Sequence, residues 1–176
     1  MLIADGITQF NSYLKSLLMT DGSGVLIGGL GFNCVEYTGT GNQALTNTAQ
    51  TVIIATPAPD FAPKGTNFTN VGGVVTYTGA NAVSVEVSFK VTGIANTNQR
   101  STAYHAVYLN NSEVTRSRTY TYHRVNADGL GSGVDVVRLD LVNGDTIDIR
   151  SRENNTADNV TVQRQFCRLS IKEIHV

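Results

Sequence analysis

The hydrophobic pattern between residues 82 and 91 repeats every two positions. Val83, Val85, Val87, Phe89 and Val91 alternate with polar or small residues. Successive side chains of a strand point to opposite sides, so this alternation predicts a strand with one buried and one solvated face. A sheet of such strands needs a second apolar layer, and similar patterns continue to the C-terminus. The chain is therefore predicted to be all-β, an antiparallel sandwich or barrel.

The remaining strand predictions follow the same pattern and the turn signals between them. They cover residues 32–38, 43–55, 74–78, 103–109, 113–125, 134–141, 145–151 and 160–174. Asn110-Asn111 and Asn143-Gly144 predict tight hairpins, because Asn and Gly tolerate positive backbone angles. Pro57, Pro59 and Pro63 fall within residues 56–63, which predicts an extended loop there.

The N-terminal segment has a different pattern. Ile7, Phe10, Leu14 and Leu17 follow a helical period over residues 6–19, and a glycine-rich stretch comes after them. We therefore expect two parts: an arm over residues 1–31 with a short amphipathic helix, and a strand domain over residues 32–176. A helix this short needs a surface for its apolar face. The sequence leaves three choices of that surface open: the helix's own domain, symmetry mates or another protein.

Length and charge restrict the classes of partner. The 176 residues suffice for one domain with a real core, and the formal net charge is −1. Nucleic acid is disfavoured, because phosphate neutralisation needs a basic surplus. No signal peptide or membrane span is expected, because the apolar run over residues 25–32 is short and broken by glycines. Cys34 and Cys167 are expected as free thiols, although their pairing stays open.

Several segments of the chain together resemble one known family. They are Val74–Tyr77 followed by Val83–Val91, the hairpin Val107–Val114, the hairpin Leu139–Ile149 with its Gly-Asp turn, and the closing strand Phe166–Ile171. In order and spacing, residues 68–176 resemble the trimeric jelly roll of the C1q and tumour-necrosis-factor superfamily. The resemblance implies an all-β antiparallel jelly-roll sandwich, here with a short N-terminal helical arm, that assembles as a homotrimer.

The same fold resembles accessory proteins of tailed bacteriophages, including head-decoration proteins, head fibres and tail knobs. The Thr-, Asn-, Gly- and Val-rich composition without Trp suits this branch. It implies a virion protein assembled in the host cytoplasm: a homotrimeric decoration, or cement, protein that docks on the major capsid protein of a phage head. Ile7, Phe10, Leu14 and Leu17 would then anchor it. The alternative is a trimeric fibre tip or knob that binds a host receptor or surface glycan.

A stripe of tyrosines and arginines gives the candidate trimer interface. Arg116, Arg118, Tyr120 and Tyr122 share one parity of the predicted strand 113–125, and Tyr104 and Tyr108 extend the stripe. Tyr and Arg are enriched at protein interfaces, whereas lone charges are costly to bury in a core. Two other interpretations remain open: an exposed sheet face with ordinary cross-strand pairs, and a sugar-binding strip.

The sequence contains no recognisable catalytic motif. His105, His123 and His175 are scattered, and no nucleophile elbow or zinc-protease motif is present, so no enzyme and no cofactor are expected. Asp140, Asp145 and Asp148 surround one hairpin and are candidate calcium ligands, but acids around a turn are more often solvated. A carboxylate pair for glycoside hydrolysis, drawn from Asp135, Asp140 and Glu153, is a minor alternative.

Overall fold

The computed structural model describes residues 34–48, 51–52, 54, 67–96, 100–124, 129–155 and 159–174. These residues belong to one unit, Asn33–Val176. The predicted N-terminal arm lies outside the described residues, and so do Ile7, Phe10, Leu14 and Leu17. The same holds for the proline loop. The boundary near residue 31 and the anchoring role of the arm therefore stay predictions.

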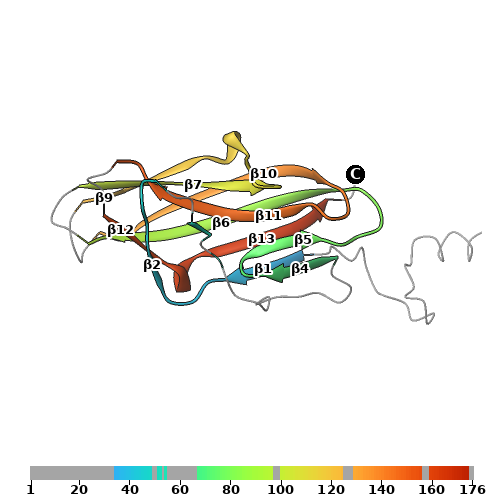
Figure 1. The fold of residues 1–176 in the computed structure, drawn as a ribbon, viewed down its shortest axis with the longest axis horizontal. Helices are drawn as coiled ribbons and strands as arrows, with labels where there is room; N and C mark the ends of the chain where they lie inside the picture. The colour runs from blue at the N-terminus through green and yellow to red at the C-terminus, as the bar shows by residue number, and fades with distance from the viewer. Residues whose placement is uncertain are drawn as a thin grey trace, which may run out of the picture. The chain divides into compact units, whose positions relative to one another are not determined.

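One sheet is organised around the long strand β6 (Val83–Ala95). On one side β6 pairs with β10 (Gly131–Leu141), and on the other with β13 (Arg168–Ile174) and β12 (Val160–Gln163). The outer strands are β1 (Cys34–Thr38), which pairs with β13, and β2 (Asn42–Ala44), which pairs with β12. Every pairing is antiparallel, and Figure 1 shows β6 and β13 running alongside each other.

The second sheet is organised around β7 (Ser101–Leu109) and β11 (Thr146–Glu153), which pair with each other. Beyond β11 lie β5 (Val74–Tyr77), β4 (Phe68–Val71) and the short β3 (Thr51–Val52). Beyond β7 lie β8 (Ser112–Glu113) and β9 (Thr119–His123). These pairings are antiparallel as well.

The core lies between the two sheets. From β6, Val85, Val87, Phe89 and Val91 are buried, and from β11 Ile147 and Ile149 join the same hydrophobic cluster. The alternation predicted for residues 82–91 is thus confirmed, because the intervening Ser84, Glu86 and Ser88 are only partly buried and Lys90 is exposed. The predicted all-β antiparallel sandwich is confirmed with it.

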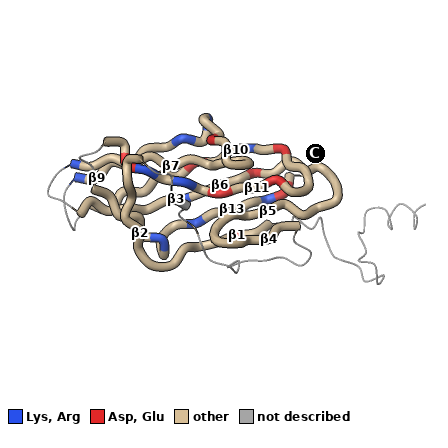
Figure 2. Tube along the Cα trace, in the orientation of Figure 1, with Lys and Arg blue, Asp and Glu red and all other residues tan. Residues whose placement is uncertain are grey.

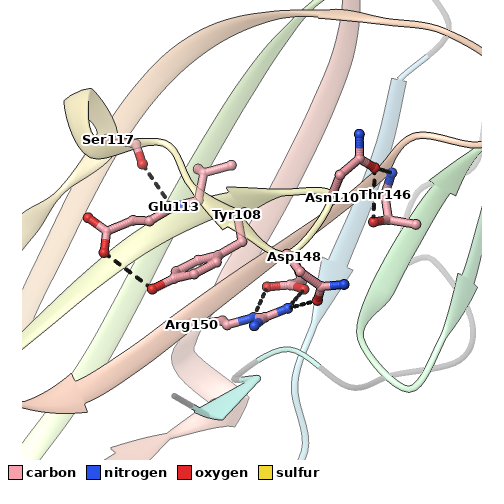
Figure 3. A network of polar contacts seen from close by, with 9 residues as sticks. Tyr108, Asn110, Glu113, Ser117, Thr146, Asp148 and Arg150 are labelled. Carbon is pink, nitrogen blue, oxygen red and sulfur yellow. Dashed lines mark hydrogen bonds and ion pairs between the residues drawn. The ribbon is translucent and has the colours of Figure 1, made fainter. Parts of the chain in front are cut away.

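The two predicted hairpins contain the expected backbone conformations. Asn110 and Asn111 have φ angles of 50° and 64°, and Gly144 has a φ of 92°. The Asn110 side chain also joins the two turns. Its Oδ1 accepts from the Thr146 amide at 2.9 Å (Figure 3), and its Nδ2 donates to Asp145 Oδ1 at 2.7 Å. The tips of β7 and β11 are therefore held at one end of the sandwich.

Two predicted strands are interrupted by short 3-10 helices. The prediction of one strand over residues 113–125 is wrong, because η1 (Thr115–Ser117) separates β8 from β9. The buried Ser117 stabilises this turn: its hydroxyl donates to the Val114 carbonyl at 2.7 Å and accepts from the Val107 amide at 2.8 Å. Likewise η2 (Arg164–Phe166) divides residues 160–174 into β12 and β13.

The predicted strand over residues 43–55 is also divided. Its described residues contain the strands β2, which belongs to the sheet of β6, and β3, which belongs to the sheet of β11. The chain therefore crosses from one layer to the other within this segment. Strand β4 was not predicted, and it forms a tight hairpin with β5 through Gly72 and Gly73, whose φ angles are 61° and 86°.

Candidate interaction surfaces

The predicted tyrosines lie on the outward side of β7, β9 and β11, which we call the Tyr/Arg face. Strand register sets its arrangement: Tyr104 lies opposite Tyr120 of β9 and Arg152 of β11. Tyr108 lies opposite Asp148 of β11 and Glu113 of β8. The face therefore has two ends, one centred on Tyr108 and one on Tyr104.

At the Tyr108 end, each charged group has a partner within the chain. Arg150 makes two contacts with Asp148, from Nε to Oδ1 at 2.7 Å and from a terminal nitrogen to Oδ2 at 2.8 Å. A third hydrogen bond runs from Arg150 to Asn111 Oδ1 at 2.6 Å, and the guanidinium lies 4.5 Å from the centroid of the Tyr108 ring (Figure 3). Bidentate pairing and ring stacking together fix the arginine.

The Tyr108 hydroxyl donates to Glu113 Oε2 at 3.2 Å. Burial and the nearby Glu113 carboxylate raise the pKa of Tyr108 to about 12, so the phenol stays protonated at any physiological pH. The polar groups at this end of the face are therefore paired with one another. This agrees with the interpretation of the stripe as a sheet face with ordinary cross-strand pairs.

The Tyr104 end is more exposed and less completely paired. Arg118 Nε donates to Glu113 Oε1 at 2.8 Å, and its guanidinium lies 5.0 Å from the Tyr104 ring centroid. Arg152 lies 4.5 Å from the same centroid. Tyr120 packs against Tyr104 with ring centroids 5.9 Å apart, yet Tyr120 and Tyr122 remain 56% and 51% exposed. The Arg152 Nε is buried without a hydrogen-bond partner among the described residues.

The structure thus brings together five of the six predicted interface residues: Tyr104, Tyr108, Arg118, Tyr120 and Tyr122. Arg116 differs, because it belongs to η1 and its guanidinium donates to the carbonyl of Arg138 on β10. The role of these residues in a trimer stays a prediction. Tyr104 and Tyr108 are already 3% and 6% exposed within one chain, so a partner would contact mainly Tyr120 and Tyr122.

A second surface, which the sequence analysis did not single out, covers the outward side of β10, β6 and β13. Val134 and Val136 of β10 are 64% and 57% exposed and stand next to Ser88 of β6. Lys90 and Arg168 line the hollow beside them, and the same two residues also line a second hollow that includes the exposed Phe166 of η2. We call this surface the valine face. Two outward valines on one strand amid small serines form an apolar strip that nothing in the described chain covers.

Beneath the Tyr/Arg face lies a buried network that joins two histidines. The Thr121 hydroxyl is 3.0 Å from Nε2 of both His105 and His123. His105 Nδ1 is 2.5 Å from Ser151 Oγ, and His123 Nδ1 is 3.2 Å from the carbonyl of Gly129. Both imidazoles are fully buried.

The contacts assign a tautomer to each ring. A carbonyl only accepts, so His123 Nδ1 carries a hydrogen and its Nε2 accepts from Thr121. The Thr121 hydroxyl then accepts from His105 Nε2, and His105 Nδ1 accepts from Ser151. A competing contact from Thr121 to the Ala103 carbonyl is longer, at 3.5 Å. Burial, with His123 nearby, lowers the pKa of His105 to about 3, so the His105 ring is neutral at physiological pH.

Sequence reasoning treated these histidines as scattered. The signal that reveals them is the register of β7 and β9, which pairs His105 with Thr119 and Ser101 with His123. The opposing strand β10 has glycine at the two positions nearest the rings, and an added Cβ at Gly131 would lie 2.8 Å from His123 Cε1. The arrangement is a polar core layer and offers no exposed nucleophile.

The remaining candidates for chemistry are held apart. Asp140 bonds to Ser84, Asp145 to Asn110 and Asp148 to Arg150, so these three aspartates, the minor calcium-binding alternative of the sequence, each have a different partner. Glu153, buried in the other sheet, accepts from the Val160 amide at 3.0 Å. Within the described ranges, no group of three or more His, Cys, Asp or Glu side chains is placed to hold a metal ion.

The two cysteines are free, as predicted. Cys167 is buried beside Thr92, and burial raises the pKa of its thiol, which makes it a poor nucleophile. Cys34 lies on β1 with its sulfur 3.8 Å from Ser170 Oγ. In the part of the chain that the structure describes, no helix combines the length and hydropathy needed to span a bilayer.

Comparison with known proteins supports the fold. No protein-family model and no curated protein sequence matches the chain. Among solved structures, Eiger TNF from S. frugiperda is similar with a TM-score of 0.55 and 14% identity, covering 82% of this chain and 93% of that one. Murine APRIL at pH 8.0 is similar with a TM-score of 0.54 and 8% identity, covering 81% and 99%. The fold is therefore a TNF-like all-β jelly roll, as predicted.

Proposed function

We propose that this protein is a structural component of a phage virion: a homotrimer that decorates the capsid, docks on the major capsid protein and stabilises the head. The observation that carries self-association is the valine face. Val134 and Val136 are each more than half exposed on β10. Exposed apolar strips framed by polar groups mark protein contacts, and closed symmetric assemblies are the common way to bury them.

Attachment to a capsid rests on the resemblance of residues 68–176 to phage accessory proteins and on the tryptophan-free composition. Each trimer would present three copies of one weak contact. Multivalency turns modest individual affinities into durable attachment without any catalytic residue. The chain would then be located in the virion, with itself and the capsid protein as its partners.

Self-association is testable by light scattering. We expect a mass of three chains for the wild type and of one chain for the double variant Val134→Asp, Val136→Asp, because six carboxylates would be buried in the contact. The matched control is Val142→Asp, at a comparably exposed valine of the β10–β11 turn. A monomeric wild type, or a double variant that remains trimeric, would exclude the valine face as the contact. Trimers lost on changing Tyr120 or Arg118 to Ala would place the contact on the Tyr/Arg face instead.

Attachment is testable with undecorated phage heads and host cell envelopes. We expect the protein to sediment with heads and to lose this binding when residues 1–24 are deleted. The second candidate function, a fibre tip or knob, is supported by the exposed rings of Tyr120 and Tyr122, since such rings are common in receptor contacts. Binding to envelopes alone, lost on changes in residues 96–100 or 154–159, would favour that function.

A further inference from the structure

The charges of the Tyr/Arg face are balanced at one end and unbalanced at the other. Its acidic side chains, Glu113 and Asp148, are both engaged, the first by Arg118 and the second by Arg150. Arg152 of β11 forms no ion pair with any described residue, and it lies at the Tyr104 end of the face, opposite Tyr104. The face therefore has a surplus of positive charge beside Tyr104 and Tyr120.

More basic groups lie toward the same end of the sandwich. Arg124 follows β9 and Arg100 precedes β7; both are exposed, and neither forms an ion pair with a described residue. Figure 2 shows basic positions at the β9 end and acidic positions gathered toward the β10–β11 turn. Because the whole chain has a net charge of −1, this surplus is a local property of one end of the molecule.

The exposed aromatic rings stand within this basic region. Tyr120 and Tyr122 project from the same side of β9, and the Tyr120 ring is braced by Tyr104. Tyr104 is in turn covered by the guanidinium groups of Arg118 and Arg152. Side chains held in this way lose little conformational freedom on binding, and Tyr and Arg carry a large share of the energy in protein contacts.

We propose that Tyr120, Tyr122 and Arg152 form a docking site for an acidic segment of a partner protein. Carboxylates of the segment would pair with Arg152 and with the arginines at the β9 end, and its aliphatic groups would cover the two tyrosine rings. A neutral sugar fits less well, because its hydroxyls need hydrogen-bond acceptors. The carboxylates of this face, Glu113 and Asp148, already accept hydrogen bonds from Tyr108 and from arginines of the same chain. The site goes beyond attachment to a capsid and does not depend on it.

The test measures fluorescence anisotropy of a labelled polyglutamate peptide titrated with the intact protein. We expect binding that weakens as salt is added, and a loss of affinity of about tenfold in Arg152→Gln and in the double variant Tyr120→Ser, Tyr122→Ser. The matched control is Arg138→Gln, at an exposed arginine on β10 of the other sheet, which should keep the wild-type affinity. Thermal melting confirms that each variant is folded.

Four results would overturn the proposal. One is the absence of binding by the wild type at low ionic strength. Another is an equal loss in Arg138→Gln, which would mean attraction to net charge without a site. The third is tighter binding of hyaluronan oligosaccharides, lost in the same variants, which would assign the face to an anionic glycan. Light scattering on the tyrosine variant completes the test: if trimers dissociate, the occupant is a second copy of this chain. Failure to bind phage heads would leave the peptide result unaffected.

Discussion

Acidification from pH 6.5 to pH 4 is expected to lower the free energy of unfolding by roughly 3 kcal/mol through His105 alone, at about 1.4 kcal/mol per pH unit. In the folded protein, burial lowers the pKa of this imidazole from 6.5 to about 3. In the unfolded chain the ring takes up a proton near pH 6.5. Between these values the unfolded state holds one more proton, so stability is fully present above pH 6.5 and falls as the pH drops.

The geometry explains why the folded ring resists protonation. Its Nε2–H donates to Thr121 and its Nδ1 accepts from Ser151, so a second proton would displace the Ser151 hydrogen bond. The neighbouring His123 opposes a second positive charge, and the charged group that β11 turns toward the same interior is Glu153, whose Oε1 is occupied by the Val160 amide. Protonation therefore favours an opened state in which water reaches the rings.

Urea unfolding between pH 7.5 and pH 5 measures this effect in a range where most carboxylates stay ionised. Relative to the wild type, His105→Gln should show a smaller fall in stability with decreasing pH, because one titrating group has been removed. Ser117→Ala is the matched control: the buried Ser117 hydroxyl bonds only to the backbone of Val107 and Val114, so its loss should cost about 1 kcal/mol at every pH and keep the slope. An unchanged slope in His105→Gln would contradict the assignment. Should this variant fail to fold, NMR titration of the wild type decides, since the His105 ring must remain neutral at pH 5.

The parts of the fold that were predicted correctly are those whose pattern is local. Alternation over residues 82–91 depends on one buried face, and β6 has that face. The Asn110-Asn111 and Asn143-Gly144 turns need positive φ angles, which these residue types supply. Even the jelly-roll resemblance rests on hairpins, each of which is a local unit in the sequence.

The elements that were missed depend on contacts between distant segments. Neither glycine nor proline marks the break in residues 113–125. The turn exists because the Ser117 hydroxyl accepts a hydrogen bond from the amide of Val107, ten residues earlier in the sequence. In the same way, no local pattern in the sequence indicates that Thr121 and His123 of β9 are buried. They are buried because β7 supplies His105 and β10 supplies glycines beside them. The periodicity shows which residues share one face of a strand, but the register of the strand pairing determines which residues that face contacts.

For the Tyr/Arg face, the sequence predicted which residues share the surface but not how their charges are paired. Its residue types and parity predicted Tyr104, Tyr108, Arg118, Tyr120 and Tyr122 on one surface, and the structure places them there. Composition did not reveal that Glu113 and Asp148 would neutralise two of the arginines within the chain. That pairing depends on β8 and β11, and it divides the face into a satisfied end and an end available to a partner.

Replacing Gly133 of β10 by Val is expected to destabilise the protein by about 2 to 4 kcal/mol. This glycine faces the histidine network, and a Cβ there would lie 3.0 Å from Thr119 Cγ2 and 3.2 Å from His105 Cδ2. The two sheets would have to separate locally or the rings would have to leave their hydrogen bonds. Arg138→Val, at an exposed position of the same strand, is the control and should change stability by less than about 0.5 kcal/mol.

A double-variant cycle separates crowding against His105 from a general intolerance of valine at position 133. His105→Ala alone removes a buried ring and leaves Ser151 without its partner, so it should be strongly destabilising. Combined with Gly133→Val, the new methyl groups would fill part of the vacated space. We therefore expect the double variant to be more stable than the sum of the two single effects by about 1 kcal/mol or more, because residues in contact couple by that amount. Strict additivity in chemical denaturation would show that the glycine does not make room for the imidazole, and the proposed packing of β10 on the histidine layer would be wrong.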